Sequence, residues 1–309
     1  MPAVLTALVH PGEPLQPHDL WTAWTFEPAT TLALGVTGVL YVIGVRRLWT
    51  RAGAGRGIRR RDVSAFSLGW LILALSQVSP LHALGDVLFS AHMVQHELLM
   101  TVATPLLVIG RPVVAFVWAL PPRWRRTAGG WTASRPVAST WSAVSHPVAA
   151  FVIHGVAIWV WHAPPLYQAA VTSDAAHAAQ HTSFVATALL FWWVVLKPLR
   201  SHGNAPMSVL VLFATVLHTG ALGALLTLTS RVIYPVYATT SAQWGLSAVD
   251  DQQLGGLIMW VPGGLAYVIV GLAVVARMLR DSEQRVAGDA LRWGSRPSAS
   301  ARRIRLDAT

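Results

Sequence analysis

Two pairs of histidines stand four residues apart within strongly apolar stretches of the chain. His92 and His96 lie in AHMVQHELLMTVATPLL, and His177 and His181 lie in DAAHAAQHTSFVATALLFWW. Residues four apart share one face of a helix, so each pair can present two imidazole nitrogens to a single point. An ionisable residue inside a membrane span is costly and is by default a candidate functional residue. The spacing therefore predicts a metal site inside a helical bundle.

Four further residues extend the candidate ligand set. Met100 stands one helical turn after His96, whereas His162, His218 and Asp251 belong to other predicted spans. Imidazole suits copper, zinc, iron and nickel, and a thioether adds a preference for Cu(I). The chain has no cysteine, which excludes a thiolate site, so a set of histidine and methionine favours copper. Asp251 fits two roles, as a direct ligand or as a group that orients a ligand histidine.

The composition is that of an integral membrane protein. Hydrophobic residues make up 54% of the chain, charged residues make up 12%, and the mean hydropathy is +0.50. A span of the hydrocarbon core needs about 20 apolar residues. The sequence predicts an all-α bundle with seven transmembrane helices, at residues 28–45, 64–84, 86–109, 146–161, 174–196, 206–229 and 252–276. Residues 1–27 then form an extracytoplasmic segment, residues 28–280 the membrane domain, and residues 281–309 a mobile cytoplasmic tail.

Basic residues set the expected orientation. With seven spans, 22 of the 23 lysines and arginines fall on one side of the membrane, and only Arg231 falls on the other. The positive-inside rule then predicts an outside N-terminus and a cytoplasmic C-terminus. The net charge of +10 is explained by this topology, so we expect no nucleic-acid partner.

This orientation places the histidines in depth. At a rise of about 1.5 Å per helical residue, His92 and His96 lie roughly 9 and 15 Å below the outer surface. His177 and His181 lie roughly 5 and 10 Å below it, and His218 lies roughly 18 Å below it. The cytoplasmic halves of the same spans are almost entirely apolar. The sequence thus predicts a polar, metal-binding layer in the outer half of the membrane.

Three other interpretations deserve comparison with a copper site. A membrane haem b protein would take one histidine from each of two helices as axial ligands. A metal permease or copper-resistance transporter needs a polar path through the cytoplasmic half, where few polar residues occur. A metallohydrolase of the HExxH type needs glutamate after the first histidine, but Met93 and Ala178 stand there. We therefore expect that the protein is not an enzyme.

Several longer strings resemble one known family. AHMVQHELLMTVATPLLVIGRP, WHAPPLYQAAV, HAAQHTSF, YPVYA and DDQQLGGLIMWVPGG together are similar to the multi-span CtaG family of cytochrome c oxidase assembly factors. The resemblance covers roughly residues 84–280. It implies a seven-span protein of the bacterial plasma membrane that supplies or forms the copper B centre of a haem-copper oxidase. The implied partners are the oxidase subunit that carries this centre, an extracytoplasmic copper donor and the lipid bilayer.

The resemblance also assigns residues. His92 and His96 match the family's first HxxxH motif, and the pair at 177 and 181 matches the second. His162 matches the WHxPP string, and Asp251 matches the acidic residue that precedes the last span. A paired-cysteine transfer mechanism does not follow, because the chain contains no cysteine.

Overall fold

The computed structural model describes residues 15–200 and 203–294, and within these ranges every regular element is helical. The first half comprises η1 (Pro17–Thr22), α1 (Pro28–Ala52), α2 (Arg60–Val78), α3 (Pro80–Gly85), α4 (Phe89–Glu97), η2 (Leu98–Ala103), α5 (Thr104–Ile109), α6 (Pro112–Ala119), α7 (Pro122–Thr132) and α8 (Arg135–Val144). The second half comprises α9 (Pro147–His162), α10 (Pro164–Thr172), α11 (Asp174–Val195), α12 (Lys197–Arg200), α13 (Ala205–Leu228), η3 (Pro235–Tyr237), α14 (Thr240–Gln243), α15 (Ala248–Ile258), η4 (Met259–Gly263) and α16 (Gly264–Gly294). The all-α prediction is confirmed for the described residues.

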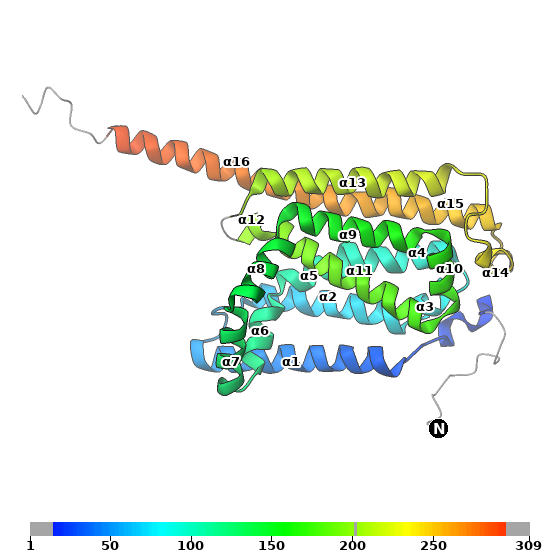
Figure 1. Cartoon of the computed structure of the whole chain (residues 1–309), viewed down its shortest axis with the longest axis horizontal. Helices are drawn as coiled ribbons and strands as arrows, with labels where there is room; N and C mark the ends of the chain where they lie inside the picture. Colours follow the sequence, from blue (N-terminus) through cyan, green and yellow to red (C-terminus); the bar gives the residue numbers. More distant parts are fainter. Residues whose placement is uncertain (1–14, 201–202, 295–309) are drawn as a thin grey trace, which may run out of the picture.

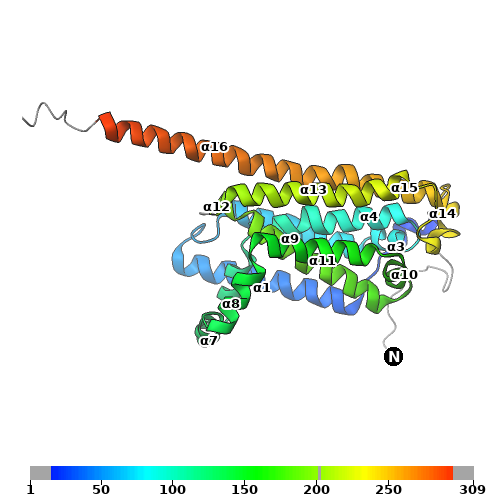
Figure 2. The same ribbon diagram turned by 45° about the horizontal axis from the view of Figure 1, so that its top comes forward.

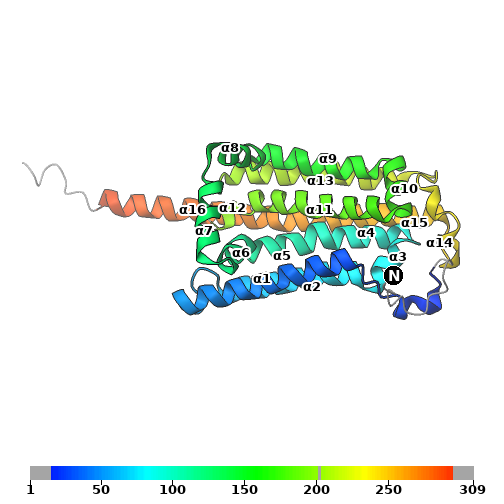
Figure 3. The ribbon, with the colours of Figure 1, turned by 60° about the horizontal axis from the view of Figure 1, so that its bottom comes forward.

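The long helices form one elongated bundle. Helix α1 packs on α6, α2 on α5, α4 on α15, α11 on α9, and α13 on both α15 and α16 (Figures 1 and 3). The short helices α3, α10 and α14 gather at one end, whereas α7, α8 and α12 gather at the other (Figure 1). Helices α7 and α8 project sideways from this second end (Figure 2). Large aromatic side chains fill the centre, including the fully buried Phe184, Phe191 and Trp192 of α11.

Apolar side chains also cover the outer surface of the bundle. On α13, Leu210, Phe213 and Leu217 share one face and are 58%, 60% and 57% exposed. An exposed apolar stripe of this kind is stable against hydrocarbon rather than against water. Within the described residues, four helices are long and apolar enough to cross a membrane, namely α1, α11, α13 and the continuous stretch from α15 through α16. These features identify a helical membrane protein.

The number of spans depends on two bent helix pairs. The segment 89–109 meets α6 at 58°, and α8 meets α9 at 69°; counting each pair as one span raises the total from four to six. Helix α2 is absent from these candidates, and its first turn carries Arg60, Arg61 and Asp62. The predicted span 64–84 also ends early, because α2 stops at Val78 and α3 starts at Pro80. Seven spans and the orientation of the termini therefore stay predictions.

The predicted terminal segments lie partly outside the described residues. In the N-terminal segment, residues 1–14 are outside the description, and η1 begins at Pro17. At the other end, α16 continues as a helix to Gly294, well past the end of the bundle (Figure 1). Residues 281–294 of the predicted tail thus belong to this helix, and residues 295–309 lie outside the described residues.

Two π-helical turns interrupt the helices that surround the histidines. The turn η2 ends just before Pro105, and the turn η4 contains Pro262. Proline lacks an N–H group and its ring clashes with the carbonyl four residues earlier, so a helix that contains it must widen or bend. Such π-turns are rare and occur frequently at functional sites. The first of them begins directly after the helix that carries His92 and His96.

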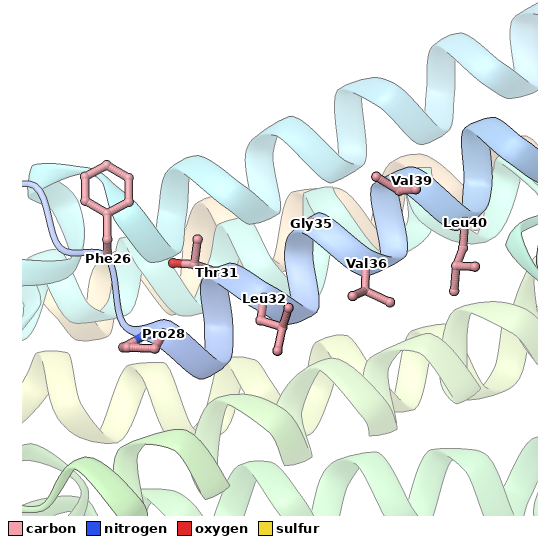
Figure 4. A pocket seen from close by; sticks show the side chains of 8 residues that line it. All are labelled: Phe26, Pro28, Thr31, Leu32, Gly35, Val36, Val39 and Leu40. Carbon is pink, nitrogen blue, oxygen red and sulfur yellow. The ribbon is translucent and has the colours of Figure 1, made fainter. Parts of the chain in front are cut away.

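An apolar groove of about 690 Å³ runs along the exposed face of α1 (Figure 4). It is lined by Phe26, Pro28, Thr31, Leu32, Gly35, Val36, Val39 and Leu40. Helix α1 is the least buried of the four helices that are long and apolar enough to span a membrane, because only 17% of its most apolar stretch is buried. Hydrocarbon is the solvent that suits this face in a bilayer.

Two glycines of α1 offer a matched test of its docking. A Cβ atom built on Gly44 would lie 1.8 Å from the backbone oxygen of Ala115 in α6, whereas one built on Gly35 meets nothing within 4 Å. Gly44→Ala is expected to lower the free energy of unfolding by about 2 kcal/mol or more, because α1 must move away from α6. Gly35→Ala is expected to be neutral or stabilising, because alanine favours the helix. Thermal unfolding in detergent measures both, and equal midpoints for the two variants would contradict this packing.

Candidate metal centre

Three buried histidines from two helices converge near one end of the bundle. His92 and His96 belong to α4 and His181 belongs to α11, and one nitrogen from each lies within 4.8 Å of the other two. The side chains are 0%, 1% and 6% exposed, respectively. Their ring centroids are 4.3 Å apart for His92 and His96 and 5.1 Å apart for His96 and His181. The helical spacing of the first pair thus places both rings on the face of α4 that meets α11.

The ring of His92 is oriented by groups behind it. Its Nδ1 lies 3.2 Å from the carbonyl oxygen of Gly85 and 3.3 Å from the hydroxyl of Tyr237. A carbonyl only accepts hydrogen bonds, so in the neutral ring Nδ1 carries the hydrogen and Nε2 carries the lone pair. This Nε2 atom is buried and has no hydrogen-bond partner among the described residues. A hydrogen bond from one ring nitrogen to a carbonyl, with the other nitrogen free, is the usual arrangement of a metal-binding histidine.

The rings of His96 and His162 leave further nitrogens without partners. Both ring nitrogens of His96 are buried and unpaired within the described part of the chain. In α9, His162 donates from Nδ1 to the carbonyl oxygen of Ile158 at 2.7 Å, which leaves its Nε2 unpaired and buried. The two ring centroids are 6.2 Å apart. Because buried polar groups in folded proteins are almost always satisfied, this concentration of free nitrogens indicates a ligand.

The second pair continues the cluster toward the end of the bundle. His177 is partly exposed, and its Nε2 lies 3.0 Å from Nε2 of His181. The ring of His177 also lies 5.3 Å from that of His92. On its other side, Nδ1 of His181 lies 3.2 Å from the amide nitrogen of Gln77. Both predicted pairs therefore meet, and His177 stands between the buried nitrogens and the surface.

Asp251 holds the beginning of α4 rather than facing the cluster. Its carboxylate accepts hydrogen bonds from the backbone N–H groups of Phe89 and Ser90 at 2.7 and 3.0 Å, and from the Ser90 hydroxyl at 2.5 Å. The residue is 0% exposed. An anion at a helix N-terminus satisfies donors that have no partner within the helix and interacts favourably with the helix dipole. Of the two roles left open by the sequence, this geometry supports the orienting one.

Two predicted ligands have other surroundings. His218 of α13 packs against α9, where its ring lies 5.4 Å from that of Phe151 and its Nδ1 accepts a hydrogen bond from Trp159 at 3.3 Å. Met100 lies within η2, packs in the main hydrophobic core, and accepts a hydrogen bond from Trp192 at its backbone oxygen. The π-turn that contains Met100 changes the helical register after Glu97.

His82, which the sequence predicts only at the outer end of a span, and Gln95, which the sequence pattern does not single out, also adjoin the cluster. The ring of His82 in α3 is stacked on that of His177, with centroids 5.1 Å apart and planes inclined by 4°. Gln95 donates to the carbonyl oxygen of Ser76 at 2.6 Å, and its amide nitrogen lies 3.0 Å from Nδ1 of His82. The sequence signal that could have identified Gln95 is its position between His92 and His96 in an apolar stretch. The partners of Gln95 come from α2 and α3, and spacing alone does not reveal that these helices lie beside it.

The fold and the cluster define a helical membrane protein with a buried group of imidazoles from α4, α9 and α11. The family model of the cytochrome c oxidase caa3 assembly factor (Caa3_CtaG) matches residues 39–281. The chain belongs to this family, which confirms the family resemblance of its motifs.

Curated relatives come from mycobacteria. An uncharacterized protein of Mycobacterium leprae is 27% identical over 276 residues, which cover 86% of this chain and 41% of the relative. An uncharacterized protein of Mycobacterium tuberculosis is 28% identical over 283 residues, which cover 86% of this chain and 40% of the relative. The chain therefore spans about two fifths of the length of these relatives. No solved structure matches the chain.

Proposed function

We propose that this protein binds copper at the cluster of His92, His96 and His181 and helps to form the copper B centre of a haem-copper oxidase. The observation that carries the proposal is the convergence of three buried imidazoles, of which His92 Nε2 and both ring nitrogens of His96 have no hydrogen-bond partner among the described residues. His162 and His177 are the adjoining imidazoles that complete the coordination shell as the ion arrives or leaves. The family description, which names cytochrome c oxidase assembly, supplies the biological setting.

The chemistry of the donors supports copper as the cargo. With Asp251 engaged by α4 and no cysteine in the chain, the available ligands are neutral imidazoles. Nitrogen ligands bind Cu²⁺ more strongly than the other divalent metals of the first transition row. A site without thiolate also permits exchange of the ion with a second histidine site, which is the chemistry that delivery requires. The protein then acts as a metallochaperone and not as an enzyme.

The predicted topology would give this transfer a direction. If α2 counts as a seventh span and the arginine-rich end is cytoplasmic, the cluster lies in the outer half of the bacterial plasma membrane. Copper would then arrive from an extracytoplasmic donor and pass laterally to the oxidase subunit within the bilayer. The cluster contacts His82 of α3 and Tyr167 of α10, two short helices that lie at the same end of the bundle (Figure 1).

Haem binding receives less support from the geometry. A porphyrin needs a flat space between its two axial histidines. Here the rings pack on one another, and Phe184 fills the space beside His96 at a centroid distance of 4.8 Å. The imidazoles are therefore spaced for an ion and not for a macrocycle.

The oxidase itself provides the test of function. In a host that carries His92→Ala together with His96→Ala, the purified haem-copper oxidase is expected to keep its haem and to lose most of its copper B. The copper-to-haem ratio, measured by elemental analysis and absorption, reports this loss. A host with His218→Ala is the control, because His218 lies in the membrane domain but outside the cluster. A normal copper-to-haem ratio in the double variant would refute the proposed function.

A further inference from the structure

A second polar site lies at the arginine-rich end, away from the histidines. A cavity of about 280 Å³ opens between the end of α1 and the corner that joins α6 to α7. Its walls include Arg47, Thr50 and Arg51 from α1, and Pro121, Pro122 and Arg125 from the corner. Three arginines thus line one space, which we call the arginine pocket.

Two of these guanidinium groups are held in place by the protein. Arg47 donates from Nη1 to the carbonyl oxygen of Ala119, and Arg125 donates from Nη2 to that of Leu120 at 3.2 Å. The Arg125 guanidinium also lies 4.1 Å from the ring centroid of Trp118, within range of a cation–π contact. These contacts use the last carbonyls of α6, which have no partner within the helix. Arg47 and Arg125 are therefore held beside the cavity, whereas Arg51 is exposed and makes no such contact with the described residues.

The pocket carries positive charge without a matching acid. The ion pairs of the described chain join His18 to Asp19, Arg61 to Asp62 and Arg277 to Asp281, and none involves the three pocket arginines. Nε of Arg125 is buried and has no hydrogen-bond partner among the described residues. Each guanidinium has five N–H donors, so most donors in the pocket stay available. The positive-inside rule explains why arginines occur at this end, but not why three converge on one cavity.

We propose that the arginine pocket binds a phosphate group, carried either by the headgroup of an anionic phospholipid or by a free phosphate compound. Planar guanidinium groups match phosphate oxygens in bidentate pairs. Basic pockets between membrane helices on the cytoplasmic side are known to hold anionic headgroups. The neighbouring Trp124 and Trp131 of α7 are 59% and 67% exposed, as expected of residues at the membrane interface.

A bound phosphate would add to the contacts that α1 already makes with α6. It would bridge α1, whose outer face is widely exposed, to the α6–α7 corner. A ligand that binds only the folded state stabilises it in proportion to the logarithm of its concentration over its dissociation constant. Thermal stability is therefore a direct readout that does not depend on metal or oxidase.

The experiment compares delipidated protein in detergent with the same protein after addition of phosphatidylglycerol, phosphatidylcholine or inorganic phosphate. Arg51→Gln is the pocket variant, because Arg51 makes no hydrogen bond or ion pair with the described residues whose loss would unfold the protein. Arg47→Gln with Arg51→Gln is the stronger variant. The matched control is Arg56→Gln with Arg60→Gln, two exposed arginines at the same end of the bundle. Melting midpoints and native mass spectrometry report binding.

Phosphatidylglycerol is expected to raise the melting midpoint of the wild type and of the control, and to remain bound in the mass spectrum. The pocket variants are expected to need at least about tenfold more lipid for the same rise, since a bidentate charged contact is lost. An equal rise with inorganic phosphate would identify a free phosphate compound as the ligand. No rise with either phosphatidylglycerol or phosphate, or equal rises in pocket and control variants, would overturn the proposal.

Discussion

Purified protein is expected to bind copper at about one ion per chain, and His92→Ala with His96→Ala is expected to weaken this binding by more than about 100-fold. Mutation of a group that hydrogen-bonds to a metal ligand lowers metal affinity about 10–100-fold, so removal of two ligands must lower it further. The double variant removes both imidazoles that α4 contributes to the cluster and leaves His181 without nearby partners on that helix. Metal analysis after gel filtration, with a competing chelator to measure affinity, gives the result.

His218→Ala is the matched control for copper binding. His218 is also a histidine of an apolar helix, but it contacts Phe151 and Trp159 of α9 instead of the cluster. This variant is expected to keep the copper of the wild type. Equal loss in both variants would mean that the cluster is not the copper site. A haem Soret band in the purified wild type would point to haem binding, and zinc alone would reopen the question of hydrolytic chemistry.

The histidine pairs could be predicted from sequence because their chemistry is local. The spacing of His92 to His96 and of His177 to His181 fixes a shared helix face wherever the helix packs. The bounds of α9, α11 and α13 also agree closely with the predicted apolar stretches, since length and hydropathy define such helices. What spacing does not determine is which faces meet. The convergence of α4 and α11 depends on packing between segments that are far apart in sequence.

The remaining differences arise where the chain departs from a regular α-helix. Met100 was expected to continue the face of His96, but the π-turn before Pro105 changes the register there. His82 was expected near the outer end of a span that runs to residue 84, but the break before Pro80 starts a separate short helix. That helix brings His82 onto His177. A proline in the sequence predicts that a helix breaks there. Tertiary contacts, however, set the direction that the chain takes after the break.

Replacement of Asp251 by alanine is expected to lower the free energy of unfolding by about 4 kcal/mol and to abolish copper binding as a consequence. The carboxylate accepts three buried hydrogen bonds at the start of α4. Hydrogen bonds to a charged group contribute about 1.5–3 kcal/mol each, and their loss leaves buried donors without partners. The first turn of α4 would then fray, and His92, two residues after Ser90, would lose its fixed position.

Two further variants separate this orienting role from direct ligation by Asp251. Asp250→Ala is the matched control, because Asp250 is the exposed neighbour and is expected to change the melting midpoint little. Asp251→Asn keeps one accepting oxygen, so its midpoint is expected to lie between those of the wild type and Asp251→Ala, with copper affinity reduced in parallel. If instead Asp251→Asn lost copper while keeping the wild-type midpoint, the carboxylate would be a ligand. We expect the melting midpoint and the copper affinity to fall together. The Asp251 carboxylate lies away from the cluster, so it can affect a bound ion only by holding the start of α4 in place.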